Sequence, residues 1–324
     1  MNNEVVTENL VVLPLVTVMQ GIQTSYGVVW ALALLLGIFF VRGCLRLQGT
    51  TLTAPCLWAL AAIVALACVP ALDCYVEPAM PPINRSALQF AAVALTFCPI
   101  MAVLGAKRPQ HRGWQWVVFS LWIVIVWPAA QAVILPQGLY VELFIAWKLF
   151  LAGLISIGLM NYLPTRFASA ALLTALGQIV LLDDYLGNFA NIDSQWTLAV
   201  GLGCFTCAAI LASRPDLSAK SFLRDTAQRV LAEEQRQTIP DDKETGDLSP
   251  HCLASSTIQW RRFRDAFGAF WSLRILGQIN QNAEVRKWPM RLHWSGFIIQ
   301  ESLPTDQQIA ELEQQMATLL RRFM

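Results

Sequence analysis

Residues 22–41, with the sequence IQTSYGVVWALALLLGIFFV, contain no charged side chain. A helix needs about 20 residues to cross the roughly 30 Å hydrocarbon core of a bilayer, because each residue adds about 1.5 Å. This stretch is apolar over nearly all of that length. It therefore predicts a membrane-spanning helix near the start of the chain.

Six further apolar runs fill the rest of the first two thirds of the chain. They cover residues 53–72, 87–106, 116–135, 139–160, 167–182 and 195–213. The chain is 56% hydrophobic and 14% charged, and soluble domains are only about 45–50% apolar. Helices are expected for all seven runs, because lipid cannot satisfy backbone polar groups. The fold class predicted is an all-α, polytopic seven-helix bundle, in which Pro99 and Pro128 kink their helices.

Charges between the runs predict the orientation of the bundle, because Lys and Arg near spans stay in the cytoplasm. Basic residues follow the first, third, fifth and seventh runs, and these residues are Arg42, Arg46, Lys107, Arg108, Arg112, Arg166 and Arg214. The opposite connections carry Glu4, Glu8, Asp73, Glu77, Asp183, Asp184 and Asp193, with Arg85 as the basic exception. We expect Asp183 and Asp184 to lie in a solvated acidic loop. The N-terminus is expected outside and the C-terminus in the cytoplasm, with the chain in an inner or plasma membrane.

Composition changes abruptly after Arg214. Residues 214–324 contain 15 of the 23 Lys and Arg residues and 14 of the 22 Asp and Glu residues. Within this region, residues 238–250 (TIPDDKETGDLSP) are acidic, rich in turn formers and without apolar periodicity, which is typical of a linker. We therefore expect a bundle over residues 1–213, a stalk helix and flexible linker over 214–255, and a small cytoplasmic domain over 256–324.

The C-terminal domain is expected to be mainly helical and to contain a β-hairpin. Aromatic residues spaced by three and four predict an apolar stripe on a helix that begins at Ser256, and the hairpin with a last helix from residue 304 would cover it. Ser295 and Gly296 fit a two-residue hairpin turn. The stripe and its arginines also form the candidate surface for a protein partner or anionic lipid. Its residues are Trp260, Arg261, Arg264, Phe267, Trp271 and Arg274.

Lys148 is the most informative polar residue in the bundle, because a charge within a span costs about 2.5–3.5 kcal/mol on insertion scales. Glu142 precedes it in the same run, and Gln131 and Gln178 lie in the neighbouring runs. Together these four residues would form a ligand site that binds an anionic head group or relays protons. The alternative is that Lys148 reaches the outer interface, or pairs with Glu142 or Asp183 to hold helices together.

The sequence predicts no catalytic residue, metal site or cofactor. Most of the eight cysteines fall inside apolar runs, where cysteine is a small apolar residue. Pairing is considered only for Cys68 and Cys74, and Cys204 with Cys207 is expected to support close helix packing. The three histidines, His111, His251 and His293, all lie outside the runs.

Two functions remain open from the sequence. The leading hypothesis is a non-enzymatic anchor or sensor whose cytoplasmic domain binds a protein partner or the inner leaflet. The alternative is a transporter or lipid-handling membrane enzyme with a polar intramembrane site around Lys148. A nucleic-acid partner is not expected, because basic residues on a membrane-tethered domain meet anionic lipid first.

Overall fold

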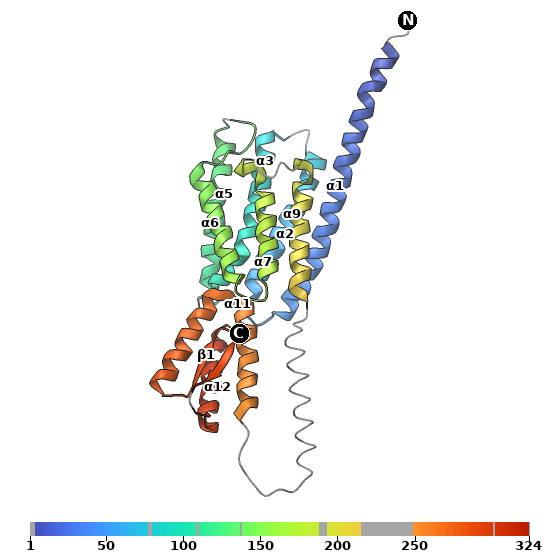
Figure 1. Ribbon diagram of the computed structural model, residues 1–324. Coiled ribbons are helices and arrows are strands. Elements are labelled where there is room, and N and C mark those ends of the chain that lie inside the picture. Colours follow the sequence, from blue (N-terminus) through green and yellow to red (C-terminus); the bar gives the residue numbers. More distant parts are fainter. Residues whose placement is uncertain are drawn as a thin grey trace, which may run out of the picture. The chain divides into compact units, whose positions relative to one another are not determined.

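The computed structural model describes residues 4–76, 80–107, 110–136, 138–187, 193–214, 249–300 and 302–323. The structure is mostly helical, at 80%, with one two-stranded sheet. It divides into two compact units, of which the first contains residues 1–211 and 323–324 and the second residues 212–322. Figure 1 shows a helical bundle in the first unit and a hairpin with helices in the second.

Six helices of the described chain are long and apolar enough to cross a membrane. They are Thr24–Arg46, Thr53–Leu72, Pro82–Leu104, Arg112–Ile134, Ile145–Tyr162 and Trp196–Ser213. At most half of the most apolar window of each helix is buried, so many apolar side chains face outward, where lipid would contact them. The chain is therefore an integral, multi-pass membrane protein. The run expected as the sixth span forms a shorter apolar helix, Ala168–Leu181.

The bundle is built from nine α-helices within the described residues. Their bounds are α1 Glu4–Arg46, α2 Thr53–Val76, α3 Pro82–Ala94, α4 Cys98–Leu104, α5 His111–Ile134, α6 Ile145–Tyr162, α7 Ala168–Leu181, α8 Asp183–Leu186 and α9 Ser194–Ser213. The start of α6 differs from the prediction, which began this span at residue 139. The residue before it, Phe144, is extended, with φ −64° and ψ 154°. Apolar character alone did not separate this extended segment from the helix.

The third predicted span contains a break. After α3, a single 3-10 turn covers Leu95–Phe97 before α4 begins at Cys98. Pro99 lies in the first turn of α4 and has no N–H to continue the α-helical hydrogen bonds. The Thr96 hydroxyl donates to the Val93 carbonyl oxygen at 2.7 Å. Pro128, in contrast, lies inside α5, which is one continuous helix.

The core of the bundle draws on most of its helices. Its largest fully buried side chains are Leu36, Leu66, Phe90, Phe97, Ile125, Leu151, Leu181, Leu182 and Leu202. Helices α7 and α9 approach closely at Gly177, where an added Cβ would lie 2.7 Å from the Phe205 ring and 3.0 Å from the Gly201 carbonyl oxygen. Only glycine leaves room for this approach. The short helix α7 is thus part of the packed bundle (Figure 1).

The second unit contains α11 (Ser249–Val285), β1 (Met290–His293), β2 (Gly296–Ile299) and α12 (Asp306–Leu320). Helix α11 begins at Ser249 rather than at Ser256, and it is interrupted at Gly268, whose φ of 75° and ψ of −171° are not helical. Glycine adopts such a positive φ without steric cost. The predicted stalk helix and most of the predicted linker lie outside the described residues.

The predicted hairpin is present, with its turn one residue earlier than expected. Met290 pairs with Ile299 and His293 with Gly296, so the turn residues are Trp294 and Ser295. Gly296 has a φ of 140°, and a Cβ there would collide with the Thr257 side chain of α11. The need for glycine at this position therefore comes from close packing on α11 as well as from the backbone conformation.

The predicted apolar faces of α11 and α12 form the interior of the second unit. Buried side chains from the helices and hairpin are Trp260, Phe263, Phe267, Trp271, Ile275, Ile279, Trp288, Met290, Leu292, Ile309, Leu312 and Met316. Helix α12 starts with a capping box, in which Gln308 N donates to the Thr305 hydroxyl and Thr305 N donates to the Gln308 side chain. These reciprocal bonds satisfy two backbone donors that a helix start leaves open.

Candidate functional site

Lys148 lies in the first turn of α6, not deep within a span. Its side chain is half-buried, and its Nζ donates to the carbonyl oxygen of Leu186 at 2.9 Å. Leu186 is the last residue of α8, where carbonyl groups lack helical partners and favour a positive charge. Lys148 therefore joins the beginning of one helix to the end of another.

Gln178 has a comparable partner at the break in the third span. Its side chain is 6% exposed, and its Nε2 donates to the Thr96 carbonyl oxygen at 3.1 Å. Thr96 belongs to the 3-10 turn between α3 and α4. In a bilayer a polar side chain from a neighbouring helix is one of the few groups that can satisfy such a carbonyl. Gln178 thus stabilises an irregular stretch of backbone.

The structure does not join the four predicted ligand-site residues through common contacts. Glu142 is exposed in the non-helical segment before α6, and Gln131 is exposed on α5. The hydrogen bonds of Lys148 and Gln178 go to two different backbone carbonyls. This arrangement favours the interpretation in which the polar residues of the bundle connect helices.

A buried polar cluster lies near Lys148, and the sequence did not indicate it. The Tyr185 hydroxyl donates to the Ser86 carbonyl oxygen at 3.0 Å, and Val141 N donates to the Ser86 hydroxyl at 3.1 Å. The Tyr185 ring packs 4.8 Å from Phe90. These contacts fix α8 and the segment before α6 against α3. The only signal in the sequence would have been a tyrosine that follows two acidic residues. An aromatic residue at the membrane interface gives the same pattern, so this signal did not indicate a buried cluster.

Asp183 and Asp184 occupy different environments, although both were expected to be solvated. Asp183 is 2% exposed, whereas the side chain of Asp184 is exposed. Partial desolvation and the neighbouring Asp183 carboxylate raise the pKa of Asp184. Burial likewise raises the pKa of the Tyr185 hydroxyl. The expectation of a solvated acidic pair is therefore wrong for Asp183, because the α8 turn directs it inward.

The predicted partner surface of the second unit is mainly interior. Trp260, Phe267 and Trp271 are each at most 6% exposed. They pack in the core described above, as an apolar stripe covered by the hairpin and α12 requires. These aromatic side chains are therefore not accessible to a partner in this structure.

Two of the three arginines of that surface hold the hairpin turn. Arg261 Nε donates to the Ser295 carbonyl oxygen at 2.7 Å, and Arg264 Nη1 donates to that of Trp294 at 2.9 Å. Arg264 also binds the buried Asp265 carboxylate at 2.8 Å. Arg274 is exposed, with its guanidinium 5.9 Å from the Trp271 ring centroid. Of the six predicted residues, Arg274 is the one that is exposed at the surface.

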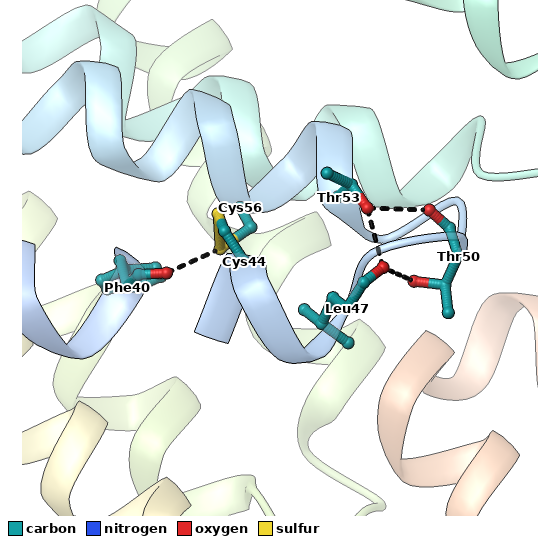
Figure 2. Close-up of a disulfide and its surroundings, with 6 residues drawn as sticks. All are labelled: Phe40, Cys44, Leu47, Thr50, Thr53 and Cys56. Atoms are coloured by element: carbon teal, nitrogen blue, oxygen red, sulfur yellow. Dashed lines mark hydrogen bonds between the residues drawn. A yellow bond between two sulfur atoms is a disulfide. The ribbon is translucent and has the colours of Figure 1, made fainter. Parts of the chain in front are cut away.

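A disulfide joins Cys44 at the end of α1 to Cys56 at the beginning of α2 (Figure 2). Sequence reasoning considered only Cys68 and Cys74, which are free and exposed. The spacing of 12 residues between Cys44 and Cys56 would have suggested the pairing only if the helix-to-helix connection had been known to be tight. Among the described residues no group of three or more potential metal ligands is found.

No protein-family model, curated protein or solved structure is significantly similar to this chain.

Proposed function

We propose that this chain is a non-enzymatic membrane anchor or sensor whose second unit lies in the cytoplasm and binds the anionic inner leaflet. The proposal has two parts, the membrane topology and the lipid-binding surface. A cytoplasmic protein partner is the competing occupant of the same surface, and the experiment below separates the two.

The proposed topology has seven spans, with α7 included. At about 1.5 Å per residue this 14-residue helix is about 21 Å long, so it requires local thinning of the bilayer. Its inclusion is supported by the close packing of Gly177 against α9 and by the charges at its two ends, Arg166 before it and Asp183 after it. Without this span those opposite charges would lie on the same side.

The orientation proposed has the N-terminus outside, because the connections that carry Arg42, Arg46, Lys107 and Arg166 alternate with acidic ones. Reporter tags at residues 80 and 300 of the full-length chain test it. We expect opposite compartments, with residue 300 in the cytoplasm. The same compartment for both tags would contradict the topology.

The lipid-binding surface is the exposed face of α11 after Gly268. Phe270 is 50% exposed and Leu273 60% exposed, and Arg274 is exposed beside them. Their spacing of three and four places them on one side of the helix, opposite the buried Ile275 and Ile279. This combination of apolar and basic side chains carries the proposal, because it is how surface helices bind anionic interfaces.

Hydrogen exchange of the full-length chain in nanodiscs tests the surface. Residues 269–281 are expected to be more protected in nanodiscs that contain phosphatidylglycerol than in purely zwitterionic ones. Arg274→Glu should abolish this difference, since a basic residue near an anionic surface contributes about 1 kcal/mol. Gln314→Glu, at an exposed position of α12, is the matched control and should preserve it. Equal exchange in both lipids would contradict leaflet binding and favour a protein partner.

The ligand-site alternative has less support, because Lys148 and Gln178 donate to backbone carbonyls. Native mass spectrometry of full-length protein provides the test. Under our proposal, Lys148→Met retains as many phosphatidylglycerol molecules as the unmodified chain. A specific loss in Lys148→Met, with none in Gln131→Met, would instead support a lipid-handling site.

A further inference from the structure

Cys44 and Cys56 lie on either side of the short connection between α1 and α2 (Figure 2). Their Cα atoms are 5.8 Å apart, within the usual range for a disulfide. The two sulfur atoms differ in their surroundings. Cys56 is 7% exposed, whereas Cys44 is half-buried and lies between the exposed Arg42 and Arg46.

The connection between the helices is ordered by hydrogen bonds that do not involve the sulfur atoms. The Leu47 carbonyl oxygen accepts from the Thr50 hydroxyl at 2.8 Å, and the Thr53 hydroxyl lies 2.8 Å from it as well (Figure 2). Leu47 N donates to Gly43 O at 3.0 Å, which extends the end of α1. These contacts do not depend on the S–S bond, so they would also hold the two cysteines close in the reduced form.

The reduced Cys56 thiol would also have a defined partner. Its Sγ lies 3.3 Å from the carbonyl oxygen of Phe40, one turn before Cys44 on α1. A thiol at this position donates to that oxygen and stays directed toward α1. Cys44 is therefore the more exposed residue of the pair, and Cys56 is the more buried one, with its Sγ directed toward α1.

We propose that Cys44 and Cys56 form a reversible thiol–disulfide exchange site for a water-soluble, low-molecular-weight thiol and its disulfide. In oxidation, the Cys44 thiolate attacks the solute disulfide, whose S–S bond breaks to release one solute thiol. The Cys56 thiolate then attacks Cys44 in the mixed disulfide, which forms the Cys44–Cys56 bond and releases the second solute thiol. The two protein thiols lose two electrons and two protons, and the solute disulfide gains both.

Reduction follows the same steps in reverse, with the solute thiol entering at the more accessible Cys44. The proposed orientation adds a reason for reversibility, since the α1–α2 connection would then lie in the cytoplasm. Cytosolic disulfides are usually transient and redox-sensing. The exchange chemistry itself rests on the accessibility of Cys44 and the order of the connection, and it does not depend on lipid binding by the second unit.

The exchange is tested with full-length protein in nanodiscs, equilibrated in buffers of varied reduced-to-oxidised glutathione ratio. After an acid quench, free thiols are labelled with a maleimide under denaturing conditions and counted by intact mass. We expect a reversible step of two labels, which Cys44→Ser and Cys56→Ser each abolish. Cys68→Ser removes an exposed free cysteine of α2 and should leave the step intact.

The roles of the two cysteines give an independent readout. Cys56→Ser should accumulate a glutathione adduct on Cys44, and Cys44→Ser should show far less adduct because Cys56 is buried. Thr53→Ala should lower the equilibrium constant for the disulfide by at most about fivefold, the limit set by the loss of one hydrogen bond. Thr174→Ala removes a similar hydroxyl bond in α7 and should have no effect. Absence of the two-label step, or equal adducts on both serine variants, would overturn the proposal.

Discussion

The two units direct their apolar side chains in opposite ways. In the bundle, large apolar residues remain exposed along the spans, such as Leu34 at 67% and Leu149 at 66%. In the second unit most of the large aromatic residues are inside, such as Trp260 at 0% and Phe267 at 6%. Both units are mainly α-helical, so the difference in which apolar side chains are exposed reflects the surroundings of each unit and not its secondary structure.

The units also share one feature, because each uses side chains to satisfy irregular backbone. In the bundle Gln178 and Lys148 donate to carbonyls at a helix break and a helix end. In the second unit Arg261 and Asn280 bind carbonyls of the hairpin. The bundle has few polar residues for this purpose, and lipid offers no substitute for their hydrogen bonds.

Replacing an exposed leucine by arginine in each unit tests this difference directly. Of the predictions made here, we expect the substitution in the bundle to have the largest effect. Leu34→Arg places a charge near the middle of a span, which costs about 2.5–3.5 kcal/mol on insertion scales. Leu273→Arg adds a charge at an exposed position of α11, with an expected change within about 0.5 kcal/mol. Membrane-inserted fractions and thermal unfolding of the full-length variants measure both. Equal losses would show that the two units do not differ in solvent.

Asn280→Ala tests the hairpin contacts of the second unit. The Asn280 amide donates to the Leu292 carbonyl oxygen and accepts from Leu292 N, both at 2.8 Å. Loss of both bonds should destabilise the hairpin by about 2 kcal/mol, measured by hydrogen exchange of residues 290–299 in the full-length chain. The exposed neighbour Asn282 supplies the control, and Asn282→Ala should leave this exchange unchanged. Unchanged exchange in Asn280→Ala would mean that these bonds contribute nothing.

Gln178→Leu tests a side-chain contact to irregular backbone within the bundle, and its expected effect is the smallest of these predictions. It removes the donor to the Thr96 carbonyl oxygen and leaves that group in an apolar interior, at a cost of about 1 kcal/mol or somewhat more. Gln131→Leu, on an exposed side chain, should be neutral or stabilising. Thermal unfolding in one detergent compares the pair. A neutral Gln178→Leu would indicate that the 3-10 turn needs no external donor.

The spans could be located from the sequence because length and apolar content act over one local segment. The start of α6 could not, since Val141 and Leu143 are buried in a non-helical segment that is as apolar as a helix. The hairpin was predicted to within one residue, because turn formers between apolar runs are also a local signal. Seven spans and the orientation remain predictions.

The candidate site depended on contacts that no local pattern reports. Lys148 and Gln178 were assigned to one predicted ligand site, but their hydrogen bonds go to backbone carbonyls 38 and 82 residues away. Carbonyl groups occur at every position, so the sequence cannot indicate which one a side chain reaches. The Cys44–Cys56 pairing was missed for a related reason, because it depends on how tightly two helices turn.

The hairpin bonds described for the second unit have a consequence for assembly. Asn280 occupies both backbone groups of Leu292 on one edge of the sheet, and the Thr257 hydroxyl accepts from Phe297 N on the other. A two-stranded sheet would otherwise offer these groups to a strand of a second molecule. Proteins held in a membrane meet each other at high local density, so this arrangement works against cross-linking of neighbouring copies by strand addition.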